Sequence, residues 1–185
     1  MSGLEILRWP DPRLSILCDP VRPGEDMGDL IRDMFTPMYA APGRGLAAPQ
    51  VGVLKRLFVM DCGWKDGEMT PMVCINPEII HAGAMVPGEE GCLSIPGVLG
   101  EVMRPERSVL RFSDQDGRRQ EMELDGFEAR CAQHELDHLD GLVTFDRLSP
   151  EARRVVVAAC SVSFPAKNPA SNPAKNPAAN PARPA

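Results

Sequence analysis

The stretch "CAQHELDHLDG", residues 131–141, places two histidines four positions apart, with a glutamate directly after the first. On an α-helix, residues four apart lie on one face a turn from each other, so His134 and His138 can reach the same metal ion. Glu135 lies beside them, where a carboxylate can move a proton. A hydrolytic metal also needs a third protein ligand and an open position for water. The stretch therefore predicts a helix that carries most of a catalytic metal site.

The residues that flank this stretch predict where the helix begins and ends. Asp125 can cap its start, with Glu128 three residues later in capping-box register, and Gly141 can end it. Phe127 and Cys131 then share a face with both histidines. We therefore expect the metal site to lie where this helix meets a sheet.

The rest of the chain predicts a sheet and one further helix. Apolar residues at helical spacing from Met27 to Met38 indicate an amphipathic helix that ends at Pro42-Gly43. The other expected elements are a Gly/Ala-rich loop at 43–52, strands at 56–62 and 72–80, a short apolar run at 89–97, and a hairpin at 108–124 turning at Asp116-Gly117. The predicted class is α+β, with a mostly antiparallel sheet packed around one central metal-binding helix.

The last 21 residues, "PAKNPASNPAKNPAANPARPA", have a different composition from the rest. A segment with repeated prolines and no large apolar residue cannot bury enough surface to fold, so we expect a disordered tail at 165–185 and a single catalytic domain at 1–164. The tail holds three of the 20 basic residues and no acidic ones. Residues 1–164 therefore carry 17 basic against 26 acidic residues, a net charge of −9, which argues against direct nucleic-acid binding.

The sequence predicts a cytoplasmic protein. The start "MSGLEILRWPDPRL" lacks the basic and apolar regions of a signal peptide, and no run approaches the roughly 18 apolar residues of a membrane span. The six cysteines are scattered without a CxxC pair, so we expect reduced thiols.

Candidates for the third metal ligand lie on both sides of the helix. Downstream, "HELDHLDGLVT" has Thr144 where one protease group has its third histidine, and Glu151 is the only later glutamate. Neither suits a large zinc protease. Upstream, Cys92 in "EGCLS" follows Gly91, which allows close backbone approach. A lone cysteine is usually a core residue, but one on a strand facing the helix would offer a thiolate to the two imidazoles.

Three motifs in this order, "GRGLAAPQ", "EGCLS" and "QHELDH", resemble the signatures of peptide deformylases. The resemblance extends to "RWPDPRL" and "DGLVTFDRLSP" and covers about residues 4–155. It implies that Cys92, His134 and His138 bind one divalent metal, that Glu135 is the general base and then acid, and that the side-chain amide of Gln50 and the backbone N–H of Leu93 stabilise the oxyanion. The implied reaction removes the formyl group from the N-terminal methionine of new polypeptides.

The resemblance also suggests the metal and the partners. Cysteine with two histidines suits iron(II), zinc, nickel or cobalt, and iron(II) is the common choice in the family. The substrate would be N-formylmethionyl nascent peptides, lying extended with backbone contacts at Gly45 and Gly91. We expect a monomer without membrane contact. The tail differs from the basic C-terminal helix with which some members dock on ribosomes, so a transient ribosome contact is left open.

Two positions depart from the family pattern. Arg44 replaces an aliphatic residue of the first motif, and Leu99 stands where many members have an arginine that holds the peptide backbone. These changes leave a metallo-amidase for another small N-acyl substrate as an alternative. Two further alternatives are a binding protein with a structural metal, and an enzyme that uses Cys92 as a thiol nucleophile.

Overall fold

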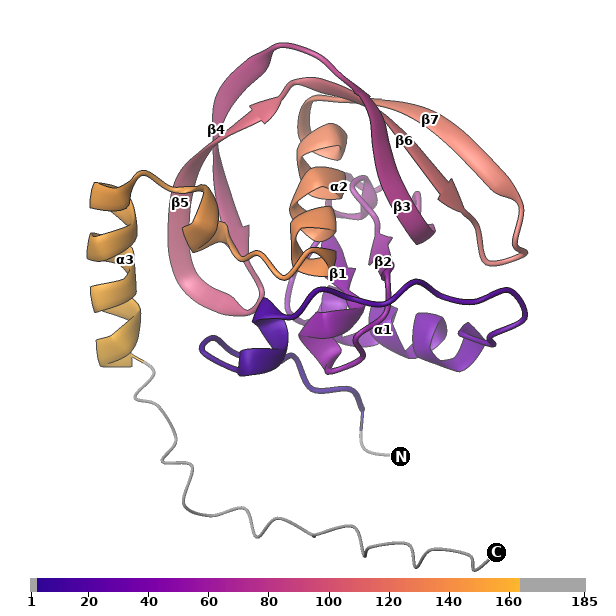
Figure 1. Ribbon diagram of the computed structural model, residues 1–185, viewed down its shortest axis with the longest axis horizontal. Coiled ribbons are helices and arrows are strands. Elements are labelled where there is room, and N and C mark those ends of the chain that lie inside the picture. The colour runs from indigo at the N-terminus through magenta and orange to yellow at the C-terminus, as the bar shows by residue number, and fades with distance from the viewer. Residues whose placement is uncertain (1–2, 164–185) are drawn as a thin grey trace, which may run out of the picture.

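The computed structural model describes residues 3–163 (Figure 1). The tail expected to be disordered, 165–185, lies outside the described residues. The helices are α1 (Gly28–Ala40), α2 (Gly126–Leu139) and α3 (Pro150–Ser163). The strands are β1 (Gly45–Ala47), β2 (Leu57–Met60), β3 (Met72–Ala82), β4 (Met85–Cys92), β5 (Ile95–Pro105), β6 (Arg107–Ser113) and β7 (Arg119–Asp125). Short 3-10 turns occur at η1 (Pro12–Ser15), η2 (Ala48–Val51), η3 (Trp64–Asp66) and η4 (Thr144–Arg147).

The strands form two antiparallel sheets. The larger has the order β1-β2-β3-β6-β7, and the smaller is the β4–β5 hairpin. Helix α2 lies between them, with β4–β5 on one side and β3, β6 and β7 on the other (Figure 1). This arrangement confirms the predicted α+β class with a central helix.

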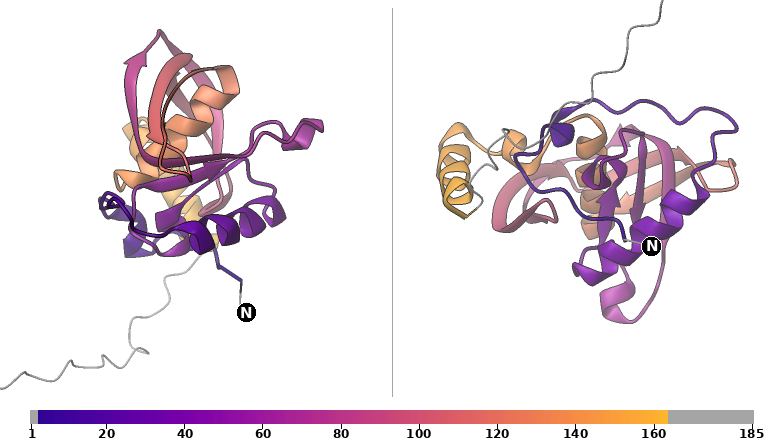
Figure 2. Two further views of the ribbon diagram at one scale, coloured as in Figure 1. Left: turned by 90° about the vertical axis from the view of Figure 1, so that its right-hand side faces the viewer. Right: turned by 90° about the horizontal axis from the view of Figure 1, so that it is seen from below.

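Strands β1 and β2 are buried on both faces because α1 and α2 cover them from opposite sides (Figure 2). Alternate residues of each strand point to opposite faces, so Leu46 and Val59 pack toward α1 while Ala47 and Phe58 pack toward α2. The apolar face predicted for α1 supplies Met34 and Met38 to the same core. Two layers of core thus hold β1 rigidly beside α2.

Four expected elements are confirmed, and two segments contain more regular structure than expected. Helix α1, the strands β2 and β3 and the β6–β7 hairpin lie where the patterns place them. The segment 43–52 is not only a loop, because it contains β1 and η2. The apolar run at 89–97 is part of a long hairpin, β4–β5, whose glycines, prolines and outward-facing glutamates conceal its strand pattern.

The ends of α2 match the sequence prediction in part. Gly141 adopts the left-handed conformation after the helix, and its N–H donates to the carbonyl of His138, as expected of a helix end. Asp125 occupies the N-cap position, but its side chain makes no cap hydrogen bond. Instead, the N–H of Gly126 donates to the carbonyl of Glu106 at the start of the β5–β6 connection. The predicted capping box was therefore wrong.

Among residues 3–163, no helix has the length and apolar character needed to cross a bilayer. The five cysteines whose side chains are described, Cys18, Cys62, Cys74, Cys92 and Cys131, are all buried free thiols. These thiols agree with the expectation that the chain is not held together by disulfides.

Candidate active site

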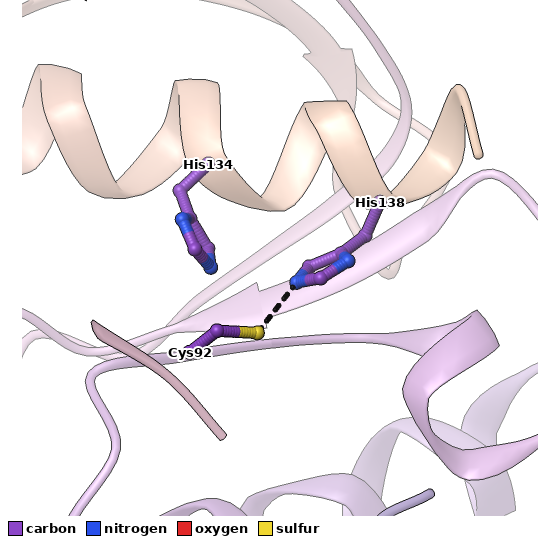
Figure 3. Close-up of side chains that lie close together, drawn as sticks. All are labelled: Cys92, His134 and His138. Atoms are coloured by element: carbon purple, nitrogen blue, oxygen red, sulfur yellow. Dashed lines mark hydrogen bonds between the residues drawn. The ribbon is translucent and has the colours of Figure 1, made fainter. Parts of the chain in front are cut away.

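Cys92, His134 and His138 come together at the inner face of α2 (Figure 3). The sulfur and one nitrogen from each ring all lie within 4.8 Å of one another, and Cys92 Sγ is 3.2 Å from His138 Nε2. Figure 3 shows both rings pointing from the helix toward the sulfur. One soft thiolate and two imidazoles at such separations form a donor set suited to a single divalent transition metal.

The periodicities of a strand and a helix bring these groups into register. In β4, Glu90 and Cys92 are buried while Gly91 between them is exposed, because successive side chains of a strand alternate. Two residues of strand span about 6.6 Å, and four residues of helix rise about 6 Å. The spacing of Glu90 and Cys92 along the strand therefore matches that of His134 and His138 along the helix. Glu90 contacts His134, and Cys92 contacts His138 one helical turn further on.

A buried carboxylate orients His134. Its Nδ1–H donates to Glu90 Oε2 at 3.0 Å, which leaves Nε2 for a metal. Arg104 donates two hydrogen bonds to Glu90, of 2.6 and 2.9 Å, and Arg130 donates a third, of 2.9 Å. Arg104 also donates to Asp137 Oδ2 at 2.8 Å. The network therefore fixes one face of α2 against the β4–β5 hairpin and sets the tautomer of the ligand.

The network also controls ionisation at the site. Burial raises the pKa of the Glu90 carboxyl, but hydrogen bonds from Arg104 and His134 outweigh this effect and lower it to about 2. Burial likewise opposes ionisation of Cys92, yet the neighbouring His138 and His134 hold the pKa of its thiol well below the usual range. The thiolate, which is the metal-binding form of cysteine, is thus favoured where the ligand set requires it.

Glu135 is buried, with only 4 % of its surface exposed. Burial raises the pKa of its carboxyl to about 7, although the two adjacent histidines oppose the shift. Within residues 3–163, its Oε2 has no hydrogen-bond partner. A buried carboxylate with a free oxygen and a pKa near neutrality is suited to accept and return a proton.

Gln50 and Leu93 both lie next to Cys92. The side chain of Gln50 is held by Ala47, whose N–H donates to Oε1 at 2.8 Å, and its Nε2 donates to Ser94 Oγ at 3.1 Å and lies 3.6 Å from Cys92 Sγ. Leu93 follows Cys92 in the turn between β4 and β5. The amide of Gln50 is thereby aimed at the metal site from η2.

A cleft of about 780 Å³ opens over these groups. One wall is the segment from Ala41 to Gly45, and the other is the end of β4 with the turn and start of β5. Gln50, Cys92, His134 and Glu135 line the cleft, and so do Gly45 and Gly91. The cleft therefore brings every residue that the sequence motifs single out, except the deeper His138, to one accessible surface.

The chain matches a protein-family model described as polypeptide deformylase over residues 3–154. The chain belongs to the polypeptide deformylase family. It is therefore an enzyme that removes the N-formyl group from newly made polypeptides. Enzymes of this family need a bound metal ion for activity. The matched region contains the whole Cys92, His134 and His138 cluster and the network that supports it.

Curated and solved deformylases resemble this chain over most of its length. Peptide deformylase 2 of Prochlorococcus marinus (strain MIT 9313) is 53% identical over 150 residues, which cover 80% of this chain and 72% of that protein. The peptide deformylase of Alkalilimnicola ehrlichii is 47% identical over 155 residues, covering 83% and 86%. A Legionella pneumophila deformylase crystal structure superposes with a TM-score of 0.81 at 39% identity, covering 88% of this chain and 95% of that one. A Synechococcus elongatus deformylase, solved with actinonin, has a TM-score of 0.79 at 39% identity, covering 88% of each chain.

Sequence reasoning missed the groups that support the ligands of this deformylase. Glu90 stands next to Glu89 in "EEGC", and only the alternation of a strand could have indicated that one of them is buried. Arg104 and Asp137 also read as ordinary surface charges, yet they are 4 % and 6 % exposed. A buried charge is costly unless it is paired, so their burial shows a role that composition conceals.

The two departures from the family pattern lie in the cleft wall. Arg44 donates to the carbonyl of Cys62 and to Asp66 Oδ2 at 2.9 Å, and its guanidinium lies 5.2 Å from the ring centre of Phe127. This charge is therefore used to hold η3 and α2 together. Leu99 is 64 % exposed in the cleft lining and brings no charge to that position.

We predict that Gly45→Ala lowers turnover by about 100-fold while the metal and the fold are retained. A Cβ at position 45 would lie 2.4 Å from Glu135 Oε1 and 2.8 Å from its Cδ, so the Glu135 side chain must move. The measurement is kcat with metal content. Gly83→Ala is the matched control, because its Cβ would meet only ordinary contacts of 3.4 Å or more. Unchanged kcat in Gly45→Ala would show that Glu135 needs no defined position.

We predict that Arg104→Met lowers the free energy of unfolding by about 3–5 kcal/mol, because it leaves Glu90 and Asp137 as buried carboxylates with fewer partners. Denaturant unfolding measures this loss. Arg111→Met is the control: Arg111 also pairs with two carboxylates, those of Glu78 and Glu121, but at the surface, so stability should barely change. Equal losses in the two variants would contradict the importance of burial.

Proposed function

We propose that Cys92, His134 and His138 hold one divalent metal in this deformylase, and that Glu135, Gln50 and Leu93 carry out the chemistry around it. The observation that carries the proposal is the convergence of the three ligand atoms within 4.8 Å, beside a buried carboxylate with a free oxygen. When bound, the metal supplies the Lewis acidity that makes water nucleophilic near neutral pH and polarises the formyl group.

Glu135 moves the protons of the reaction. As a carboxylate, it accepts a proton from the attacking water, and as a carboxylic acid it then donates that proton to the departing amine. Its pKa of about 7 suits both roles, because neither form is strongly favoured at neutral pH. Its position over Gly45 places it at the wall of the cleft, next to the substrate.

Gln50 and Leu93 stabilise the negative charge that develops on the formyl oxygen. The side-chain amide of Gln50 and the backbone N–H of Leu93 donate to this oxygen, and each such donor contributes about 3 kcal/mol to transition-state stabilisation. The hydrogen bond from Ala47 to Gln50 Oε1 supports this role, since it fixes which end of the amide faces the sulfur.

The peptide lies extended in the cleft, with backbone contacts at Gly45 and Gly91. The exposed position of Gly91 and the burial of Gly45 against Glu135 allow a chain to pass between them without side-chain obstruction. The recognition of backbone rather than sequence suits an enzyme that processes many nascent chains.

The setting of the reaction is also part of the proposal. We propose iron(II) as the physiological metal, with zinc, nickel or cobalt able to occupy the same ligands. The catalytic domain comprises residues 1–164 and acts as a monomer in the cytoplasm, without binding nucleic acid directly. It meets the nascent peptide as that peptide leaves the ribosome, and a transient contact with the ribosome is part of the proposal.

A metallo-amidase acting on another small N-acyl group is the second candidate. The departures at Arg44 and Leu99 favour it, because both alter the cleft wall and neither touches the metal ligands. It shares all of the chemistry above and differs only in the acyl group that fits.

Formate release from formyl-Met peptides under anaerobic conditions tests the proposal, with metal analysis of the same sample. We expect formate in proportion to the bound metal, loss of activity on chelation, and no acetate from acetyl-Met peptides. Acetate release at a similar rate would favour the amidase, and activity that survives removal of all metal would reject the metal site.

A further inference from the structure

The cleft wall carries two cations that no carboxylate neutralises in the described part of the chain. The basic residues that line it are Arg8, Arg44, Lys65 and Arg130. Arg44 is paired with Asp66, and Arg130 with Glu90. Arg8 and Lys65 have no such salt bridge among residues 3–163, so their charges face the cleft uncompensated.

Both cations are anchored beside the place where the two walls of the cleft meet. Gly43 and Leu93 are in contact there, since a Cβ at Gly43 would lie 2.6 Å from Leu93 Cδ1. Arg8 donates from Nη1 to the carbonyl of Leu93. On the other side, Trp64 Nε1 donates to the carbonyl of Gly43 at 2.8 Å, and Lys65 Nζ lies 5.6 Å from the centre of the Trp64 ring.

The segments that carry the two cations are held by further contacts. The N–H groups of Leu7 and Trp9 donate to the carbonyls of Gln50 and Ser94, at 2.7 and 3.0 Å, and so fix the chain on either side of Arg8. Asp61 accepts hydrogen bonds from the backbone of Trp64 and from Tyr39, and so fixes the start of η3. The cations therefore flank the floor of the cleft as parts of the folded structure.

The acidic groups of the cleft do not cancel these charges. The Glu90 carboxylate already accepts hydrogen bonds from Arg104, Arg130 and His134. Glu135 is buried beside the metal ligands. Glu89 is the exposed carboxylate of the wall. It lies on the same face of β4 as Gly91, opposite Glu101, and as a single negative charge it offsets no more than one of the two unpaired cations. The lining of the cleft thus keeps an excess of unpaired positive charge in a chain whose net charge is −6.

We propose that Arg8 and Lys65 are specificity-determining residues that select peptides with an aspartate or glutamate in the two positions after formylmethionine. The proposal deepens the proposed function and rests on it, because the cations act on the chain that follows the reacting end. Backbone recognition at Gly45 and Gly91 is blind to sequence, whereas an uncompensated cation on each side attracts an anionic side chain and repels a basic one. Leu99, which also lines the cleft, adds no charge to it.

The test compares formyl-Met-Ala-X-amide and formyl-Met-X-Ala-amide peptides in which X is Glu, Gln or Lys. The protein is metal-loaded, and formate release gives kcat and KM. We expect kcat/KM for the Glu peptide to exceed that for the Lys peptide by about fivefold in at least one series, mainly through KM, with Gln between them. The ratio should fall toward one at high ionic strength, because the cations are at the surface of the cleft.

Four variants separate this selectivity from general damage. Arg8→Gln and Lys65→Gln should each lower the Glu/Lys ratio, while Arg8→Lys, which keeps the charge, should preserve it. Because the ratio is measured within each variant, a uniform loss of activity does not affect it. Arg118→Gln is the control for a cation elsewhere, since Arg118 has a side chain that is 73% exposed and pairs with Asp116 in the β6–β7 turn.

The outcomes separate the charge selectivity from the deformylase function. Equal kcat/KM for the Glu, Gln and Lys peptides in the wild-type protein would overturn the charge selectivity and leave the deformylase function intact. A ratio that persists unchanged in both Arg8→Gln and Lys65→Gln would also overturn it. Absence of formate from every peptide would overturn the proposed function, and the selectivity with it.

Discussion

Replacing Glu135 with glutamine is expected to leave the metal bound and to lower formate release about 1,000-fold. Glutamine preserves the size of the side chain, but its amide cannot accept a proton from water or return one to the amine. Because Glu135 is buried and its Oε2 has no partner within the described residues, no neighbouring group is placed to substitute for it. Turnover and metal content of the same sample measure the effect.

Glu128→Gln is the matched control for this variant. Glu128 lies in the first turn of the same helix, is exposed, and does not belong to the ligand cluster. The control should therefore keep both metal and activity. Normal turnover in Glu135→Gln would rule out Glu135 as the proton carrier, and loss of the metal would show that the residue supports the site rather than the chemistry.

Replacing Cys92 with alanine is expected to remove both the metal and the activity. Two imidazoles remain, but the thiolate supplies the negative charge of the ligand set and lies 3.2 Å from one of them. Its pKa is held well below the usual range by the neighbouring histidines, so this sulfur binds as an anion. Elemental analysis and formate release measure the two losses.

Cys74→Ala controls for the removal of a buried thiol. Cys74 is fully buried on β3 and belongs to the main core cluster rather than to the metal cluster. Its replacement should reduce stability modestly through the small cavity, with metal and turnover retained. Full metal occupancy in Cys92→Ala would reject the proposed ligand set.

Local sequence patterns predicted the elements whose residues interact within one segment. The spacing of His134 and His138 predicts a helix with both rings on one face, and Gly141 marks its end; α2 has these features. The apolar spacing of α1 and the turn at Gly117 are likewise local, and the structure has the corresponding helix and hairpin. Such patterns succeed because the interactions that they describe are only a few residues apart.

The same reasoning missed features that depend on distant parts of the chain. The β5 sequence "IPGVLGEVMRP" contains two prolines and two glycines and has weak strand character by itself. It becomes a strand because β4 pairs with it and α2 packs against its buried face. The capping box failed for a similar reason, since the backbone of Glu106 supplies the acceptor at the start of α2.

Residue type and order are enough to predict the donor groups, the helix that carries two of them, and the family to which the motifs point. The folded chain is needed to show that Cys92, 46 residues before His138, faces both rings, and that Glu90 rather than Glu89 is buried against His134. This difference arises because metal ligation and the burial of charge depend on distances across packed elements. Residue order specifies such distances only after the hairpin β4–β5 has closed over α2.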